Sequence, residues 1–219
     1  MGRRVFDIVA AGAALALLSV PLALVAVAVK LSSPGPLLFR QERIGRGGRS
    51  FRLYKFRTMR DGASGGQVTV AGDARVTAVG ALLRRLKLDE VPQLINIIAG
   101  DMSIIGPRPE VARFVRQYTD RESPILQFTP GLASRAQLVY PHEGELLSRA
   151  ADPERMYVAE LMPRKIAVDL AYERHRSWWS DLVLAGEILL LVAGKSFRID
   201  HRSSLEPITG PDARAGLDR

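Results

Sequence analysis

The longest apolar stretch of the chain lies near its amino end. Residues 8–29 carry no charged side chain and are mostly Ala, Val and Leu, with Arg3 and Arg4 before them and Lys30 after them. A run of this length can cross the hydrocarbon core of a bilayer. A cleaved secretory signal is the rival interpretation, but the run is long for one and shows no evident small-residue cleavage pattern. We therefore expect a retained membrane element over residues 1–31.

This apolar run is interrupted by Pro21, with Ser19 just before it. Proline removes a backbone donor and kinks a helix, which leaves two arms that each reach only about 15 to 20 Å, short of a bilayer core of about 30 Å. Cations at both ends favour the cytoplasmic side for both. A re-entrant helix-break-helix hairpin satisfies both observations, with Ser19 bonding a carbonyl that the proline frees. One kinked transmembrane helix is the open alternative.

The hydrophobic pattern of the body predicts mainly helices and one short β-hairpin. Residues 37–39 and 51–56 are apolar or alternating runs on either side of a glycine-rich turn at residues 45–48. Residues 61–72 are rich in Gly and small polar side chains, which predicts a mobile loop. Helical spacing then predicts an amphipathic helix on four apolar positions: Val79, Leu82, Leu83 and Leu86.

The acidic pair Asp89 and Glu90 precedes Pro92 and an apolar run that ends before Gly100. Because proline fits only the first turn of a helix, a second helix is expected to start near Asp89 and to end with Gly100 as its carboxyl cap. Carboxylates at a helix amino terminus are stabilised as anions, so Asp89 is expected to stay ionised and nucleophilic. The alternative is that Asp89 only caps the helix.

The last third of the chain carries a second apolar segment. Trp178 and Trp179 precede a short apolar run, which is typical either of an amphipathic helix at a membrane interface or of a core helix. The run is too short and too charged for a secure membrane span. Residues 200–219 are rich in Pro, Gly and charge, and this composition predicts a flexible tail.

Composition narrows the class of protein. The 219 residues, 47% hydrophobic, suffice for one catalytic domain, which we place at residues 32–199. A net charge of +8 calls for an anionic partner, which could be nucleic acid, anionic lipid or a phosphate-bearing substrate, and the apolar segment favours lipid. Arg108, fixed between two prolines, is a candidate phosphate ligand, although a rigid turn explains it equally well. Cysteine is absent, which excludes disulfides and thiolate metal sites.

Five motifs occur in one order along the chain. They are RVFD at residues 4–7, QERIG at 41–45, YKFRTM at 54–59, LDEVPQL at 88–94 and GDMSIIGPRP at 100–109. Together with the broken apolar segment they resemble the catalytic core of the monotopic phosphoglycosyl transferases, bacterial sugar transferases that start glycan assembly on undecaprenyl phosphate. The resemblance covers roughly residues 3–196 and favours the catalytic interpretation of the acidic pair.

The resemblance implies roles for residues at both ends of this core. Ser19 and Pro21 form the break of a re-entrant helix, although the family commonly places the serine directly before the proline and Val20 intervenes here. Asp89 corresponds to the nucleophile that takes up the phosphosugar, and Glu90 to its acidic partner. Mg²⁺ is expected to bind at this pair.

The resemblance also assigns basic residues. Arg84 and Arg108 match positions near the phosphates, and Lys55 and Arg57 lie in the matching basic motif. After residue 131 the chain departs from the common pattern, because the arginine of an Asn-Gly-Arg turn has no clear counterpart. Arg135 is the candidate replacement.

Two later residues, Asp169 and Tyr172, match family positions for which structural and catalytic roles both stay open. The expected fold class is α/β, mainly α: a re-entrant membrane helix, amphipathic interfacial helices and a short β-hairpin. The catalytic domain is expected on the cytoplasmic face of the bacterial inner membrane.

The expected reaction moves a phosphosugar from a UDP-sugar to undecaprenyl (polyprenol) phosphate through a covalent intermediate on Asp89, with release of UMP. It would be the first membrane step in the assembly of an exopolysaccharide, O-antigen or glycoprotein glycan, and would feed downstream glycosyltransferases. Two rivals stay open. One is a membrane-bound phosphatase or pyrophosphatase that uses the same carboxylates, and the other is a non-catalytic membrane scaffold.

Overall fold

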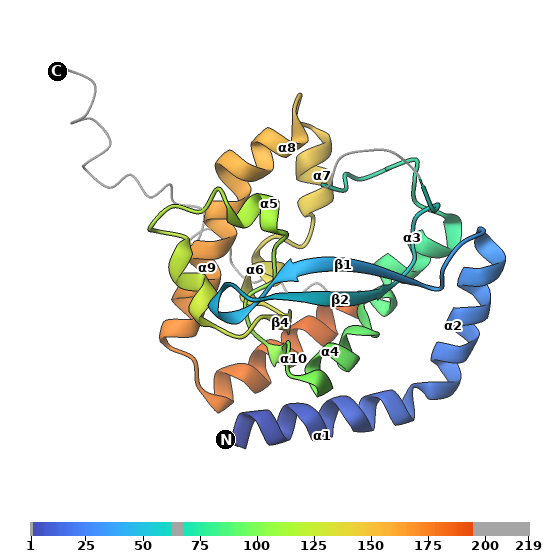
Figure 1. Ribbon diagram of the computed structural model, residues 1–219, viewed down its shortest axis with the longest axis horizontal. Coiled ribbons are helices and arrows are strands. Elements are labelled where there is room, and N and C mark those ends of the chain that lie inside the picture. The colour runs from blue at the N-terminus through green and yellow to red at the C-terminus, as the bar shows by residue number, and fades with distance from the viewer. Residues whose placement is uncertain (1, 63–67, 195–219) are drawn as a thin grey trace.

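The computed structural model describes residues 2–62 and 68–194 (Figure 1). Within them the chain is mainly helical, with two small sheets of two strands each. The mainly α prediction with a short β-hairpin is therefore confirmed. The predicted tail at residues 200–219 and the centre of the predicted mobile loop lie outside the described residues.

The amino-terminal apolar run forms two helices that meet at a sharp bend. Helix α1 (Gly2–Leu17) and helix α2 (Ser19–Ser32) are bent by 66°. Among the described helices none alone has the length and apolar character needed to cross a bilayer, whereas these two pass that test as a bent pair. Their length and composition fit a broken span or a re-entrant loop.

The break lies at Leu18, slightly earlier than the predicted kink at Pro21. Pro21 sits in the first turn of α2, where its missing N–H removes no helical hydrogen bond. The hydroxyl of Ser19 donates to the carbonyl of Ala16 over 2.8 Å, which satisfies a carbonyl at the end of α1. Ser19 therefore bonds a carbonyl beside the break, but the predicted bond to a carbonyl freed by Pro21 is not the one observed, because that carbonyl would be the one of Leu17.

Polar side chains fasten α1 to the body of the protein. The carboxylate of Asp7 is buried and accepts from the hydroxyl of Ser103 over 2.7 Å and from the backbone N–H of Ile104 over 3.3 Å. Arg4 donates to the carbonyls of Ile97 and Ile98, which lie in the last turn of α4 (Gln93–Ala99). These contacts satisfy backbone groups that the helix end and the strand would otherwise leave unpaired.

The predicted hairpin joins β1 (Leu38–Ile44) to β2 (Ser50–Phe56) through η1 (Arg46–Gly48). Its strands are antiparallel, with Phe39 opposite Lys55, and β1 is longer than the predicted run at residues 37–39. The buried amide of Asn96 fixes α4 against β2, because it donates to the carbonyl of Arg52 over 2.8 Å and accepts from the N–H of Tyr54 over 3.1 Å. The hairpin therefore lies beside the segment that carries the acidic pair.

Helix α3 (Ala78–Arg85) confirms the predicted amphipathic helix. Thr77 caps it by accepting from the N–H of Gly80 over 2.9 Å. Leu83 faces the core, but Leu82 and Leu86 are exposed, so the apolar side of this helix is only partly covered by protein.

A second sheet, which the sequence pattern does not predict, pairs β3 (Ser103–Ile105) with β4 (Gly131–Ala133) in parallel. The backbones of Gly106 and Gly131 approach so closely that a Cβ on Gly131 would lie 2.1 Å from the nitrogen of Gly106. Short segments follow: α5 (Ala112–Val115), η3 (Ser123–Gln127), α6 (Arg135–Val139), α7 (Glu143–Ser148), α8 (Pro153–Met156) and the π-helical turn η4 (Tyr157–Leu161).

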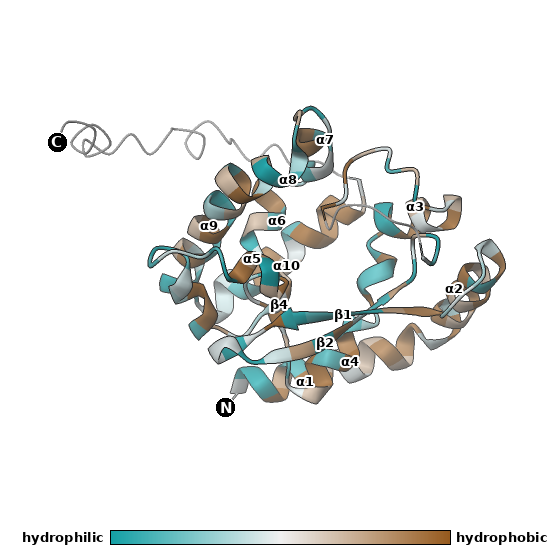
Figure 2. Ribbon diagram, turned by 45° about the horizontal axis from the view of Figure 1, so that its top comes forward, coloured by the Kyte–Doolittle hydropathy of each residue, from teal (hydrophilic) through white to brown (hydrophobic). Residues whose placement is uncertain are grey.

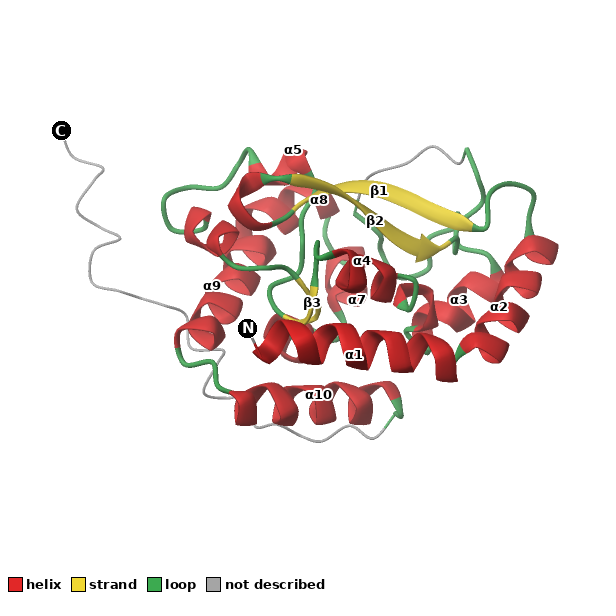
Figure 3. Ribbon diagram, turned by 60° about the horizontal axis from the view of Figure 1, so that its bottom comes forward, coloured by secondary structure: helices red, strands yellow, loops and turns green. Residues whose placement is uncertain are grey.

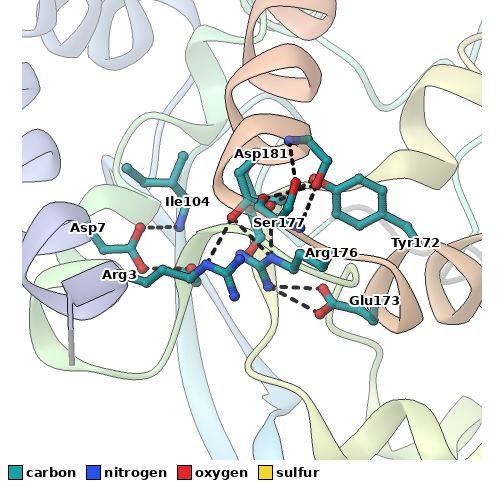
Figure 4. Close-up of polar contacts among 11 residues, drawn as sticks. Arg3, Asp7, Ile104, Tyr172, Glu173, Arg176, Ser177 and Asp181 are labelled. Atoms are coloured by element: carbon teal, nitrogen blue, oxygen red, sulfur yellow. Dashed lines mark hydrogen bonds and ion pairs between the residues drawn. The ribbon is translucent and has the colours of Figure 1, made fainter.

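Helices α9 (Met162–Arg174) and α10 (Trp178–Val192) complete the described chain. In Figure 3, α10 runs beside α1, and the ring of Phe6 lies edge-on to that of Trp178 at 5.7 Å. A charged cluster ties these helices together, since Arg3 and Arg176 both pair with the buried Asp181 (Figure 4). Leu184 of α10 is buried against Ile105 and Leu138.

The opposite face of α10 and much of α1 and α2 present apolar side chains outward. Figure 2 shows hydrophobic residues along α1 and α2. The exposed large side chains on these three helices include Val5, Val9 and Leu17 on α1, Val20, Leu24 and Leu31 on α2, and Trp179, Leu182 and Leu189 on α10. Exposed apolar side chains gathered in this way are typical of surfaces that contact another apolar phase or partner.

Candidate active site

The acidic pair lies in a tight turn between α3 and α4. Asp89 and Glu90 belong to η2 (Leu88–Glu90), a single 3₁₀ turn that follows Lys87 in the left-handed region (φ 56°). Both carboxylates are buried. Helix α4 begins only at Gln93, so the prediction that it starts near Asp89 is wrong, whereas Gly100 closes it in the left-handed conformation (φ 103°) as predicted.

Two cations hold Glu90 from opposite parts of the chain. Lys55 of β2 places its Nζ 2.9 Å from Oε1 of Glu90, and Arg108 places Nη2 2.5 Å from the same oxygen and Nη1 3.3 Å from Oε2. Burial alone would raise the pKa of Glu90, but the charges of Arg108 and Lys55 outweigh it and hold that pKa well below its usual value. Glu90 is therefore held as an anion between two cations, Lys55 and Arg108.

Asp89 is the contrasting member of the pair. Its carboxylate is buried and accepts no hydrogen bond and forms no ion pair within the described residues. Burial, and then the neighbouring charge of Glu90, raise the pKa of Asp89, while Lys55 and Arg84 oppose the shift. No backbone N–H of α4 donates to this carboxylate within the described residues, so the hydrogen bonds expected from a helix amino terminus are not formed. A nucleophile needs such an unengaged oxygen.

Two predicted basic residues gather around the acidic pair together with Arg108. Arg84 donates from Nε to the hydroxyl of Thr58 over 2.8 Å, and burial lowers its pKa while the charge of Asp89 acts in the opposite direction. Burial likewise lowers the pKa of Lys55 to about 8. Lys55 and Arg108 therefore contact Glu90 directly, and Arg84 lies near enough for its charge to act on Asp89.

The structure directs the other two predicted basic residues elsewhere. Arg57 is buried and donates to the carbonyls of Val29, Ser33 and Pro36, so it fastens the connection between α2 and β1. Arg135 forms an ion pair of 2.7 Å with Glu187 of α10. Neither set of contacts reaches the acidic pair.

The two later residues matched by resemblance make structural contacts. Asp169 is buried on α9 and accepts from the N–H of Ala136 over 2.8 Å, and burial raises its pKa to about 7. The hydroxyl of Tyr172 donates to Asp181 over 2.8 Å in the cluster of Figure 4. These contacts connect α9 with α6 and with α10.

The acidic pair is also the predicted Mg²⁺ site. The described residues contain no group of three or more His, Asp or Glu side chains that could hold a metal ion. Mg²⁺ commonly uses one or two carboxylates and completes its shell with waters and substrate phosphates. Within the described residues the oxygens of Asp89 accept no hydrogen bond and Oε2 of Glu90 makes one long contact of 3.3 Å, so the donor set of the pair fits a magnesium ion that takes its remaining ligands from outside the chain.

A network behind Arg108 was not recognised from the sequence. Arg43 of β1 donates to the carbonyl of Pro109 over 3.0 Å, Glu110 lies 3.5 Å from the same nitrogen, and Tyr157 donates its hydroxyl to Glu110. The QERIG motif that contains Arg43 contributes to the family resemblance, but no feature of the sequence shows that this arginine meets a loop so far along the chain.

Comparison with known proteins identifies the family. Residues 1–195 match the bacterial sugar transferase family. The chain belongs to this family.

Three relatives of this chain have names that state a reaction. A UDP-N-acetylgalactosamine-undecaprenyl-phosphate N-acetylgalactosaminephosphotransferase of Aeromonas hydrophila is 41% identical over 83% of this chain and 41% of its own. A UDP-glucose:undecaprenyl-phosphate glucose-1-phosphate transferase of Caulobacter vibrioides is 42% identical over 82% of this chain and 65% of its own. A putative undecaprenyl-phosphate N-acetylgalactosaminyl 1-phosphate transferase of Bacillus subtilis is 42% identical over 65% of this chain and 80% of its own. This chain thus spans less than two thirds of the first two relatives.

Proposed function

We propose that this protein transfers a phosphosugar from a UDP-sugar to undecaprenyl phosphate, with Asp89 as covalent nucleophile. The observation that carries the proposal is the inequality of the acidic pair: Glu90 is held by Arg108 and Lys55, whereas the buried Asp89 is unengaged. The names of the relatives support the donor and acceptor classes.

In the first half-reaction an oxygen of Asp89 attacks the sugar-bearing phosphorus. The new bond joins this oxygen to phosphorus, and the bond between that phosphorus and the bridging oxygen breaks, so that UMP leaves with the electron pair. Arg108 and Arg84 donate to the phosphate oxygens on which negative charge develops. Bound at Asp89 and Glu90, Mg²⁺ would supply further neutralisation of the diphosphate.

In the second half-reaction the phosphate of the polyprenol attacks the same phosphorus. The bond to Asp89 breaks, the carboxylate is restored and a polyprenol diphosphate sugar is formed. Glu90 remains anionic through both steps and keeps Lys55 and Arg108 in place. Splitting the reaction in this way lets the soluble UMP leave before the lipid acceptor enters, while the phosphosugar stays on Asp89.

The bent helix pair and the apolar side chains on α1, α2 and α10 support a membrane location for this chemistry. We propose a re-entrant hairpin that enters and leaves by the cytoplasmic face of the inner membrane. A cysteine placed ahead of Arg3 should resist a periplasm-restricted thiol reagent in intact cells and react after lysis. Labelling in intact cells would contradict the re-entrant topology.

The transfer assay separates this function from its rivals. Radiolabelled UDP-sugars, undecaprenyl phosphate and Mg²⁺ should yield a labelled lipid, and consumption of the donor should depend on the lipid. A phosphatase or pyrophosphatase would consume the donor at the same rate without undecaprenyl phosphate. A scaffold would show no turnover above that of the Asp89→Asn variant.

A further inference from the structure

Arg43 of β1 connects the hairpin with the loop that carries Arg108. Its Nη1 donates to the carbonyl of Pro109 over 3.0 Å and lies 3.5 Å from Oε2 of Glu110. Its Nη2 donates to the side-chain oxygen of Gln41 over 2.7 Å. The next residue, Ile44, adds a backbone bond of 2.8 Å from its N–H to the carbonyl of Glu110. The hairpin therefore holds both residues that follow Arg108.

The partners of Arg43 are themselves fixed. Glu110 accepts the hydroxyl of Tyr157 on its Oε1, the oxygen opposite the one that faces Arg43. Tyr157 is buried and lies in the π-helical turn η4, which joins α8 to α9. Turns of this kind are rare in helices and frequently occur at functional sites. The contacts thus run from η4 through Glu110 and Arg43 to the backbone beside Arg108.

Both terminal nitrogens of Arg43 are occupied by protein acceptors, and its Nε is buried without a partner among the described residues. Arg108, in contrast, directs its guanidinium to Glu90. Of these two arginines, Arg108 therefore contacts the acidic pair. Arg43 contacts the backbone next to Arg108.

We propose that Arg43, braced by Glu110 and Tyr157, is a positioning residue that sets the place of Arg108 against Glu90. This role rests on the proposed transferase function and adds a residue to it. A guanidinium that must meet both Glu90 and a developing phosphate charge tolerates little displacement, since a shift of about 1 Å at a catalytic group can cost about a hundredfold in rate. The hairpin also carries Lys55, so one element would position both cations that hold Glu90.

A double-mutant cycle on turnover tests this role. Arg43→Ala in the otherwise natural protein should lower kcat by roughly ten- to a hundredfold with a smaller change in KM. In an Arg108→Ala background the same change should lower kcat by less than about threefold, because the group that Arg43 positions is already absent. Equal losses in both backgrounds would overturn the proposal, since Arg43 would then act independently of Arg108.

Conservative variants separate position from charge and from folding. Arg43→Lys keeps the positive charge but loses the planar fork whose two terminal nitrogens bond Pro109 and Gln41 separately, so it should behave nearly as Arg43→Ala, and a full rescue by lysine would contradict a positioning role. Tyr157→Phe removes only the hydroxyl that braces Glu110 and should show the same background dependence with a smaller loss. It tests the role even if Arg43→Ala fails to fold.

The control is Arg113→Ala, which removes an exposed arginine of α5 that pairs with Glu154. Its small effect should be the same in both Arg108 backgrounds. The unsubstituted protein run in the same assay tests the proposed function itself: absence of any transfer there would refute the function, whereas transfer with an additive cycle would refute only the role of Arg43.

Discussion

Two of the buried charge clusters in this molecule are built in opposite ways. Where α1 meets α9 and α10, Asp181 is paired with Arg3 and Arg176 and also accepts from Tyr172 (Figure 4). At the active site Glu90 is paired just as fully, but its neighbour Asp89 has no partner among the described residues.

The difference indicates what each cluster is for. A buried carboxylate that is fully bonded stabilises one arrangement of the chain, whereas an unengaged one costs stability and persists where a ligand or a reaction uses it. The cluster at α1 fastens the apolar hairpin to the body. In the proposed function, the acidic pair keeps Asp89 available to the substrate.

Among substitutions of basic residues and of the α1 anchor, the largest effect should follow from replacing Arg108. Arg108→Ala should reduce turnover about a hundredfold or more, equivalent to about 2.7 kcal/mol of barrier, because it removes a charge-assisted donor and half of the support of Glu90. Steady-state transfer by folded protein measures it.

Arg57→Ala is the matched comparison, since this arginine is buried, whereas Arg108 is only partly buried, and it bonds backbone carbonyls near α2 instead of Glu90. It should lower the unfolding temperature while leaving the turnover of the folded fraction within about tenfold, a loss of less than about 1.4 kcal/mol. A loss of turnover as large as that of Arg108→Ala, without loss of stability, would instead place Arg57 at the substrate.

At the anchor of α1, Asp7→Ala should lower the free energy of unfolding by about 2 to 3 kcal/mol, because the hydroxyl of Ser103 and the N–H of Ile104 would be left buried without their acceptor. Ser103→Ala removes one donor only and should cost about 1 kcal/mol. Chemical denaturation in detergent measures both. Equal stability of Asp7→Ala and the unsubstituted protein would show that this anchor contributes nothing to the fold.

The smallest effect concerns Asp169, whose pKa burial raises to about 7. Between about pH 4, where the unfolded carboxyl ionises, and pH 7, the folded protein holds a proton that the unfolded chain has released. Stability should therefore fall as the pH rises through this window. Asp169→Asn keeps an acceptor for Ala136 but cannot ionise, so its unfolding temperature should depend less on pH. An unchanged slope would contradict the raised pKa.

Local sequence patterns predict several elements of this fold. Pro21 indicated a break close to the observed one at Leu18, and Gly100 indicated the end of α4. The glycine-rich turn at residues 45–48 indicated the hairpin. These features depend on neighbours in the chain, and so a local pattern can report them. The predicted start of α4 lies too early in the chain, because the 3₁₀ turn at Asp89 and Glu90 has the composition of a first helical turn.

What the sequence could not provide were contacts across long separations. Lys55 and Arg108 meet at Glu90, and Arg43 meets Pro109, only because the hairpin folds beside α4. Lys55 and Arg57 share one motif, yet adjacent strand and loop positions send them to different parts of the protein. Side-chain direction, set by tertiary packing, decides which basic residue reaches the acidic pair.

The covalent role of Asp89 is tested most directly without the lipid acceptor. Incubated with its UDP-sugar and Mg²⁺ alone, the protein should release UMP in an amount approaching its own concentration and then stop, and intact-protein mass spectrometry should find a phosphosugar adduct that fragmentation places on Asp89. Asp89→Asn should abolish both burst and adduct, whereas Glu90→Gln should slow the burst without moving the attachment. Release of UMP only when undecaprenyl phosphate is present, together with turnover by Asp89→Asn, would contradict the covalent route.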